Sequence, residues 1–522
     1  MIYFKKAHFN KNNILDFIFM GIFFLIIISI ILFKDSIFAH WSIFLDQDIT
    51  IIYNSLLVGS NIPQELLDHP AFTTVFVLNI FFKLAYFLNI SEVGNLNDLL
   101  QSSNKDLAIQ KLFNIAQIIH VFYGFLLLFF INKILFYFTK DKITDYLFTL
   151  ILLLSPSFIF LIEQIRSEIL SIILCFIYFI FLERSLSKKG YINLLCSGAF
   201  FTLALLAKVQ VIFCLYSFLL IFLAKNFNNK VFYKKKINLN TSSMILINVY
   251  FIFLIIFAIT NFFPKYIDRY FFVFIFLNYF SVFIFFEIKK NTHRAFILLP
   301  MIYFSFGCFL PILIFEFFSF FGFVSFHPSL TGVISSPVTS AFSVISGYEI
   351  NKFDKLEYIS YMINYIKDYF RFSFIFNPLS LITYFISIPV IFFNIYKKRY
   401  SNLFFITILI LIITIMNLIF GIRPYKFYLI YSMPFNLILL AFIAKDIFYP
   451  RSYALLIFIV YLFFSYSQIN TSLIKGVGKD NMDSICLKEN IENKQSYMRF
   501  WIVHFNVVIL KEICNGFFDK KR

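Results

Sequence analysis

The stretch from residue 41 to residue 74 holds the side chains of this chain that are best suited to chemistry. Asp46 and Asp48 follow the first long hydrophobic run, and Asp68 and His69 come later in the same stretch. Carboxylates at a membrane surface are costly to keep in a mostly apolar chain unless they have a function. A carboxyl group that is partly desolvated beside a bilayer has its pKa raised toward neutrality, which suits it to take a proton from a hydroxyl group. Asp46 and Asp48 are therefore the candidates for a catalytic base, and the choice between them stays open.

A group of cations would supply the second part of such chemistry. Arg and Lys side chains hold a phosphate and stabilise the charge that it gains when its bond to a sugar breaks. Inverting sugar transfer needs a base behind the attacking hydroxyl group and cations on the departing phosphate. The candidate substrate-binding residues, all expected on one side of the membrane, are Asp68, His69, Glu163, Arg166, Glu168, Lys208, Arg423 and Lys426.

Each candidate also has a simpler interpretation. Asp46 and Asp48 would only cap a surface helix, because Asp is a preferred N-cap residue. Lys208 would reach solvent from a tight turn through its long side chain. The others would be a helix start (His69 before Pro70), a local ion pair closing a turn (Glu163, Arg166 and Glu168) or ordinary loop residues (Arg423 and Lys426).

The elements that must position these residues are membrane-spanning helices. Of the 522 residues, 60% are hydrophobic and 14% are charged, and the mean hydropathy is +0.83. Soluble proteins carry about 25% charged residues, so this composition excludes a soluble domain. The net charge of +17 lies mainly in loops between apolar runs, as the positive-inside rule requires. We therefore expect a membrane partner and no nucleic-acid partner.

Basic clusters set the orientation of the predicted spans. Lys5, Lys6 and Lys11 place the N-terminus in the cytoplasm, so the first span leads outward to Asp46. Each later cluster is expected in a cytoplasmic loop: Lys133/Lys140/Lys142, Arg184/Lys188/Lys189, Lys225/Lys230/Lys234/Lys235/Lys236, Lys289/Lys290/Arg294, Lys397/Lys398/Arg399 and Lys445/Arg451.

This alternation predicts an all-α polytopic membrane protein with about thirteen transmembrane helices. The predicted spans cover residues 17–33, 112–138, 143–162, 168–183, 191–206, 209–224, 243–262, 270–286, 295–326, 372–396, 402–420, 428–444 and 452–468. Pro300 and Pro311 are expected to kink or break the span that contains them.

One apolar segment cannot cross if the alternation is to hold, and residues 72–90 are the best candidate. Asn79 and Lys83 interrupt this segment and an acidic stretch follows it, so we expect an interfacial helix on the outer surface. Residues 34–111 would then form one large external loop with two surface helices, the first from Asp48 to Gly59. A transmembrane domain of residues 1–468 would thus carry external loops at 34–111 and 327–371, followed by a small external tail at 469–522.

Several stretches resemble motifs of the GT-C superfamily, a group of multi-span glycosyltransferases that includes protein mannosyltransferases and aminoarabinose transferases. LDQD (residues 45–48) stands where the family has its acidic motif, and DHPAFTTVFVLNIFFKL (68–84) resembles its surface helix. The later stretches SPSFIFLIEQIRSEIL (155–170), ALLAKVQVIF (204–213) and GIRPYKFYLIYSMPF (421–435) resemble segments with Arg, acidic, Lys and Tyr residues. The chain departs from the family at Ala71, where a second Pro is common, and in its Asp-Gln-Asp order.

The resemblance implies an inverting membrane glycosyltransferase. Its donor would be a polyprenyl-phosphate-linked sugar, its acceptor a lipid, a glycan or a protein, and its site would face outward from a bacterial inner membrane, in the cell envelope. Some members bind a divalent metal through acidic residues, but Glu163 and Glu168 are too ambiguous to assign one. No Cys/His cluster has zinc-finger spacing. The sequence therefore assigns no metal ligand and no certain cofactor, and a divalent metal stays an open alternative.

Two other functions stay open at this point. An O-antigen polymerase or ligase also acts on lipid-linked sugars and depends on Arg and His residues in a late external loop, where this chain has His327, Glu349 and Arg371. A transporter or lipid flippase would need charges near the middle of its spans and internal symmetry. The predicted spans are nearly free of charge at their centres, which ranks this function last.

Overall fold

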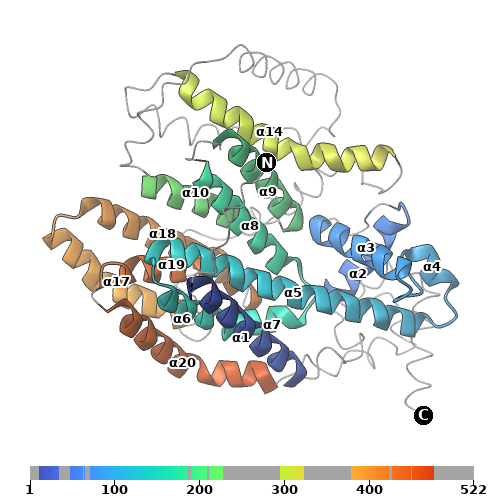
Figure 1. The fold of residues 1–522 in the computed structure, drawn as a ribbon, viewed down its shortest axis with the longest axis horizontal. Helices are drawn as coiled ribbons and strands as arrows, with labels where there is room; N and C mark the ends of the chain where they lie inside the picture. The colour runs from blue at the N-terminus through green and yellow to red at the C-terminus, as the bar shows by residue number, and fades with distance from the viewer. Residues whose placement is uncertain are drawn as a thin grey trace, which may run out of the picture. The chain divides into compact units, whose positions relative to one another are not determined.

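The structure is a computed structural model in which almost all of the described residues are helical and no strand occurs among them (Figure 1). It describes residues 11–33, 47–62, 64, 71–185, 190–208, 211–226, 294–321, 378–421, 426–447 and 449–474. Four of the described helices are long and apolar enough to cross a membrane, and a fifth span results if one bent helix pair counts as a single crossing. The chain is thus an all-α protein with helices suited to a membrane.

The chain divides into two compact units, which we describe separately. Unit 1 comprises residues 1–45, 114–165 and 362–484, and unit 2 comprises residues 46–113, 166–361 and 485–522. The helices of unit 1 are α1 (Lys11–Phe33), α6 (Lys142–Leu153), α7 (Pro156–Glu163), α17 (Pro378–Tyr396), α18 (Tyr400–Gly421), the 3-10 helix η4 (Lys426–Tyr431), α19 (Met433–Ala444) and α20 (Pro450–Ile474). Those of unit 2 are α2 (Gln47–Gly59), α3 (Phe72–Phe87), α4 (Leu96–Gln101), α8 (Ser167–Arg184), α9 (Gly190–Ala207), α10 (Ile212–Asn226) and α14 (Arg294–Phe320), and α5 (Lys105–Thr139) belongs in part to each.

Most described helices lie where the hydrophobic runs predict them, with differences at α5 and α4. α5 begins at Lys105, inside the predicted external loop 34–111, because residues 105–111 continue the helix without a Pro or Gly to stop it. The short helix α4 was not predicted, and a capping box between Asn95 and Asp98 starts it. The predicted spans 243–262 and 270–286, the loop 327–371 and nearly all of the tail 469–522 lie outside the described residues.

The predicted span at 143–162 consists of two helices. α6 and α7 occupy this segment and are bent by 67° at the break between them. Pro156 has no backbone N–H to continue the first helix, and the Ser155 hydroxyl accepts a hydrogen bond from the Phe158 amide at 3.2 Å, which caps the second helix. By contrast, α14 continues through Pro300 and Pro311 as one helix, and Figure 1 shows that it changes direction part-way, in line with the expected kink.

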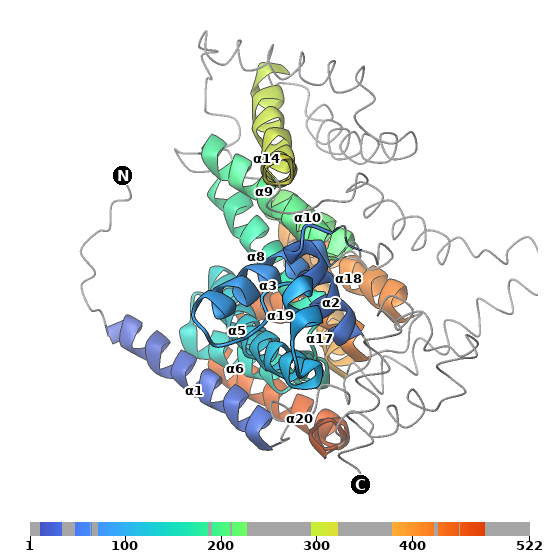
Figure 2. The same cartoon turned by 90° about the vertical axis from the view of Figure 1, so that its right-hand side faces the viewer.

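In unit 2, α9 lies between α8 and α14, as both views show (Figures 1 and 2). α9 and α14 run in the same direction, because Tyr191 stacks on Tyr303 near their starts and Thr202 donates to the Cys308 carbonyl at 2.8 Å further along. Two glycines allow this close packing. A Cβ on Gly198 would collide with the Phe304 carbonyl oxygen, and one on Gly307 with the Leu195 carbonyl oxygen. Small residues at helix contacts are typical of packing inside membranes.

The helices α2 and α3 of unit 2 differ in exposure. Residues 50–58 of α2 are all buried, so this helix is packed on every side, whereas we expected a helix lying on a surface. The Asn79 side chain of α3 donates to the Ser55 carbonyl of α2 at 2.9 Å, and a Cβ on Gly59 would collide with that amide. α3 instead keeps an exposed apolar side, formed by Ile80, Phe81, Leu84, Phe87 and Leu88. This side fits the predicted interfacial helix, which stays a prediction.

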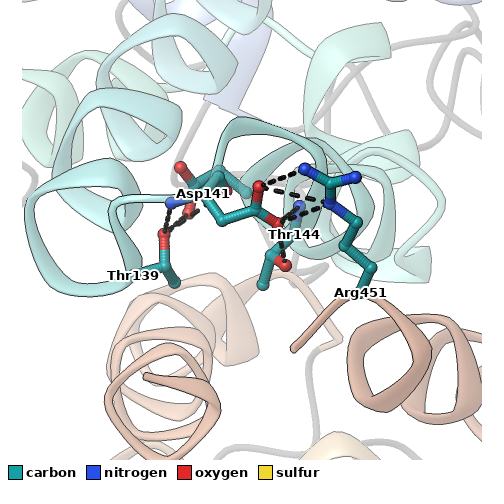
Figure 3. Close-up of polar contacts among 5 residues, drawn as sticks. Thr139, Asp141, Thr144 and Arg451 are labelled. Carbon is teal, nitrogen blue, oxygen red and sulfur yellow. Dashed lines mark hydrogen bonds and ion pairs between the residues drawn. The ribbon is translucent and has the colours of Figure 1, made fainter. Parts of the chain in front are cut away.

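In unit 1, described contacts gather three loops at one end. Phe19 of α1 stacks on Tyr146 in the first half of α6, so the start of α1 lies at this end too. The Asp141 carboxylate at the start of α6 accepts hydrogen bonds from Arg451 at the start of α20, and Thr139 and Thr144 hold Asp141 in place (Figure 3). Arg399 after α17 lies 3.6 Å from the Asp446 carboxylate after α19. Lys140 and Lys142 of the first predicted cytoplasmic cluster therefore lie at the same end of unit 1 as the predicted clusters Lys397/Lys398/Arg399 and Lys445/Arg451.

Candidate functional site

A buried ion pair joins two turns of unit 2. The Lys208 ammonium lies 3.1 Å from Glu168 Oε1, and the two side chains are only 2% and 0% exposed. Lys208 directly follows α9, and Glu168 lies in the first turn of α8. The pair was not predicted as such, although both residues were predicted for one site.

Arg166 belongs to the same cluster. It stands immediately before α8, where its side chain is 1% exposed, and its positive charge acts on Glu168 together with that of Lys208. Within the described residues, the cluster of Arg166, Glu168 and Lys208 therefore carries two cations for one carboxylate. We refer to these three residues as the charged cluster.

Local structure explains how the charged cluster forms. The chain leaves the helical conformation between Glu163 and Ser167, so Glu168 falls in the first turn of α8, where the helix dipole favours a carboxylate. At the other side, the Val211 amide donates to the Lys208 carbonyl at 3.2 Å and closes the turn after α9. α8 and α9 pack antiparallel, since the Ser197 hydroxyl donates to the Tyr178 carbonyl, and this brings the start of one helix to the end of the other.

Burial of these three charges has a large energetic cost. Moving an ion out of water costs several kcal/mol even after relaxation, and a partner charge recovers only part of that cost. An apolar replacement would stabilise the fold as well or better, so burial of the charges is easier to understand as a functional requirement than as a stability device.

One of the simpler interpretations does not describe this arrangement, and another is incomplete. Arg166 acts on Glu168 within the turn, but Glu168 also pairs with Lys208 from a distant part of the sequence. Lys208 does not reach solvent, because its side chain is buried against Glu168.

The start of α3 is attached to this end of α9. The Thr73 hydroxyl in the first turn of α3 donates to the Leu203 carbonyl of α9 at 2.9 Å. Phe72 and Phe76 of α3 contact Phe315 of α14 with ring centroids 5.0 and 5.1 Å apart. The start of α3, which directly follows Asp68 and His69 in sequence, is thus fixed to the helix that ends at Lys208. Thr73 was not among the predicted residues, and a hydroxyl at the start of an otherwise apolar helix was the signal for it.

The structure places the other predicted residues only in part. Asp46, Asp68, His69 and Arg423 lie outside the described residues. Asp48 lies in the first turn of α2 in unit 2, and nothing is described of its side chain. Glu163 ends α7 and Lys426 begins η4; these two elements pack against each other in unit 1, again without described side chains. Of the ten predicted site residues, the structure brings together Arg166, Glu168 and Lys208.

Neither a metal site nor a related protein adds to the assignment of this site. Among the described residues, no group of three or more His, Cys, Asp or Glu side chains is arranged to hold a metal ion. No protein family, curated protein or solved structure matches the chain.

Proposed function

We propose that the protein is a membrane glycosyltransferase of the GT-C type. It transfers a sugar from a polyprenyl-phosphate donor to a lipid, glycan or protein acceptor, with inversion, at the outer face of a bacterial inner membrane. The proposal includes the architecture of about thirteen spans and the external position of the site. The apolar composition and the membrane-suited helices support a membrane enzyme.

The observation that carries this proposal is the charged cluster. Arg166 and Lys208 are buried with Glu168 at the meeting point of two helix ends in a mostly apolar protein. Their charges suit a phosphate group, which accepts charge-assisted hydrogen bonds from Arg and Lys. Glu168 acts as a positioning residue, because its carboxylate fixes the Lys208 ammonium at 3.1 Å.

The proposed reaction has one displacement step. Asp46 or Asp48 removes the proton from the acceptor hydroxyl, whose oxygen attacks the anomeric carbon of the sugar. The bond between that carbon and the phosphate oxygen breaks, and the electron pair stays on the phosphate. Arg166 and Lys208 stabilise the resulting polyprenyl phosphate. Attack from the face opposite the phosphate inverts the anomeric configuration.

Binding of the lipid product tests the role of the cations. Undecaprenyl phosphate is titrated into the detergent-purified full chain, and bound lipid is followed by native mass spectrometry. We expect Lys208→Met to weaken binding about tenfold to a hundredfold, the value of a hydrogen bond to a charged group. Lys111→Met is the matched control, because Lys111 pairs with Glu92 at an exposed position. If wild type and Lys208→Met bind undecaprenyl phosphate equally well, Lys208 does not bind the phosphate.

Transfer assays test the base. Membranes with wild type, Asp46→Asn or Asp48→Asn are incubated with undecaprenyl phosphate linked to radiolabelled mannose, glucose, galactose or arabinose, and label in lipid, glycan and protein fractions is counted. One Asn variant should lose about 10²–10⁴-fold in rate while it still binds undecaprenyl phosphate. If both variants transfer normally and Arg371→Ala abolishes transfer, the O-antigen polymerase or ligase function replaces this proposal.

A further inference from the structure

One end of unit 1 carries a dense group of basic side chains. It is formed by the loop between α5 and α6, the turn between α17 and α18, and the turn between α19 and α20. Its cations are Lys140, Lys142, Lys397, Lys398, Arg399, Lys445 and Arg451. We refer to these residues as the basic end.

Polar contacts and ring contacts hold these loops together. Arg399 after α17 lies 3.6 Å from the Asp446 carboxylate after α19, and Asn402 donates to the same carboxylate at 3.1 Å. Arg451 lies 3.1 Å from Asp141 (Figure 3). Ring contacts from Phe138 to Phe405 and from Phe405 to Phe442 join the helix ends behind them. The basic end is therefore one continuous surface.

Few carboxylates balance this charge. Asp446 and Asp141 are engaged by Arg399 and Arg451, and Asp145 is fully buried beneath Thr139, 2.5 Å from its hydroxyl. Lys140, Lys397, Lys398 and Lys445 are exposed and form no ion pair within the part of the chain that the structure describes. The surface thus keeps a positive excess that attracts an anion.

Exposed aromatic rings surround the same cations. Tyr396, Tyr400 and Tyr449 are 80%, 66% and 77% exposed. The Lys397 ammonium lies 5.5 Å from the Tyr396 ring centroid, and the Arg399 guanidinium lies 5.8 Å from that of Phe393. Tyr side chains beside basic residues are typical of the boundary between membrane and water.

We propose that the basic end binds the headgroups of anionic phospholipids, with Lys397, Lys398 and Lys445 at its centre. The positive excess attracts the phosphodiester, and the apolar rings of Phe392 and Phe393, exposed on α17 one turn away, contact the acyl chains. A soluble anion would be attracted by the positive charges but would have no acyl chains to contact these rings. This inference does not depend on the proposed transferase activity.

Native mass spectrometry of the detergent-purified full chain tests the inference, with phosphatidylglycerol and phosphatidylcholine as probes. Wild type should bind phosphatidylglycerol more tightly than phosphatidylcholine. Replacement of Lys397, Lys398 and Lys445 by Gln together should weaken phosphatidylglycerol binding roughly a hundredfold, since each cation near a lipid surface contributes about a factor of five. The charge-preserving replacement of the same three residues by Arg should keep it.

The matched control removes three positive charges elsewhere. Lys83→Gln, Lys105→Gln and Lys111→Gln, combined in one chain, should leave phosphatidylglycerol binding within about twofold of wild type, because these residues belong to unit 2 and not to the basic end. If the Gln triple variant elutes as an aggregate, Lys398→Gln and Lys445→Gln are measured singly, with about a fivefold loss expected for each. Three results would overturn the inference. Wild type would bind both lipids equally, the Gln variants would bind phosphatidylglycerol as wild type does, or inorganic phosphate would displace the lipid fully.

Discussion

At the scale of single residues, Glu168 and Lys208 depend on each other. Both side chains are buried, and each neutralises the charge of the other at 3.1 Å. Removal of Glu168 leaves two buried cations without a carboxylate, whereas removal of Lys208 leaves Glu168 with the positive charge of Arg166. Their contribution to stability is therefore strongly non-additive.

A double-mutant cycle measures this coupling. Glu168→Gln should lower the free energy of unfolding by about 3–5 kcal/mol and Lys208→Met by less, because Arg166 still compensates Glu168. The loss in the double variant should be smaller than the sum of the two single losses. Thermal unfolding in detergent provides the measurement. Lys111→Met, which breaks the exposed pair with Glu92, should change stability by less than about 1 kcal/mol. Additive losses in the double variant would show that the two charges do not interact.

Asp141 is a second residue whose charge can be tested, at an exposed loop. Partial burial raises the pKa of Asp141, but the hydrogen bonds from Arg451 and Thr144 lower it by more, so its pKa lies below the ordinary value. A lowered pKa in the folded state stabilises the fold above the ordinary value near 3.9, and this stabilisation is lost as the pH falls through the lowered pKa.

Asp141→Asn isolates the charge, because Asn is also a good N-cap residue for α6. At pH 7 the variant should melt at a slightly lower temperature than wild type. The difference should shrink as the pH falls below about 4, where Asp141 takes up a proton. Melting curves at several pH values measure this, and a difference that stays constant down to pH 2 would contradict it.

At the scale of helices, α9 and α14 contact each other through their backbones. Gly198 and Gly307 leave no room for a Cβ atom, because a carbonyl oxygen of the opposite helix occupies each position. The hydroxyl of Thr202 adds a hydrogen bond across the same contact. Polar groups also join helices in unit 1, where Asn417 and Asn436 both donate to the Ser380 hydroxyl at 2.9 and 3.1 Å.

Alanine at these glycines tests the contact. Gly198→Ala and Gly307→Ala should each destabilise the protein by about 1–3 kcal/mol, because an added methyl group forces the two backbones apart. Gly21→Ala in α1 is the control, since nothing lies within 4 Å of its added Cβ, and it should stabilise by about 0.5–1 kcal/mol as Ala favours the helix. Melting temperatures of the three variants give the comparison, and similar shifts at all three positions would argue against the backbone contact.

At the scale of the whole molecule, the charges of the chain predict which side of the membrane each segment faces. The basic end of unit 1 should face the cytoplasm, and residues 34–111 should face outward. In unit 2, α8 ends at Arg184, which belongs to a predicted cytoplasmic cluster, and begins at the charged cluster, which is predicted to face outward. The two ends of α8 are therefore expected on opposite sides of the membrane.

Cysteine labelling in intact cells measures this sidedness. In a chain with Cys486 and Cys514 replaced by Ser, Ser103→Cys should react with a membrane-impermeant maleimide. Lys398→Cys should react only after the membrane is permeabilised. Both positions are exposed, so burial does not decide the result. Labelling of Lys398→Cys in intact cells would invert the predicted topology and place the charged cluster on the cytoplasmic side.

The sequence by itself determined where most of the described helices begin and end, because hydrophobic runs, caps and helix-starting prolines act within a few residues. Ser155 and Pro156, for example, start α7 through contacts that are local in sequence. The sequence also identified Arg166, Glu168 and Lys208 as unusual, since charges beside apolar runs are visible without a structure.

Only the tertiary structure decided which charges meet. Glu168 could have paired within its own turn, and its pairing with Lys208 depends on the antiparallel packing of α8 and α9. The burial of α2 and the contact through Gly198 and Gly307 likewise depend on neighbours far along the chain. Local sequence patterns determine whether a segment is helical and where the helix begins and ends. Which helices then pack against each other depends on how all of them bury their apolar side chains together.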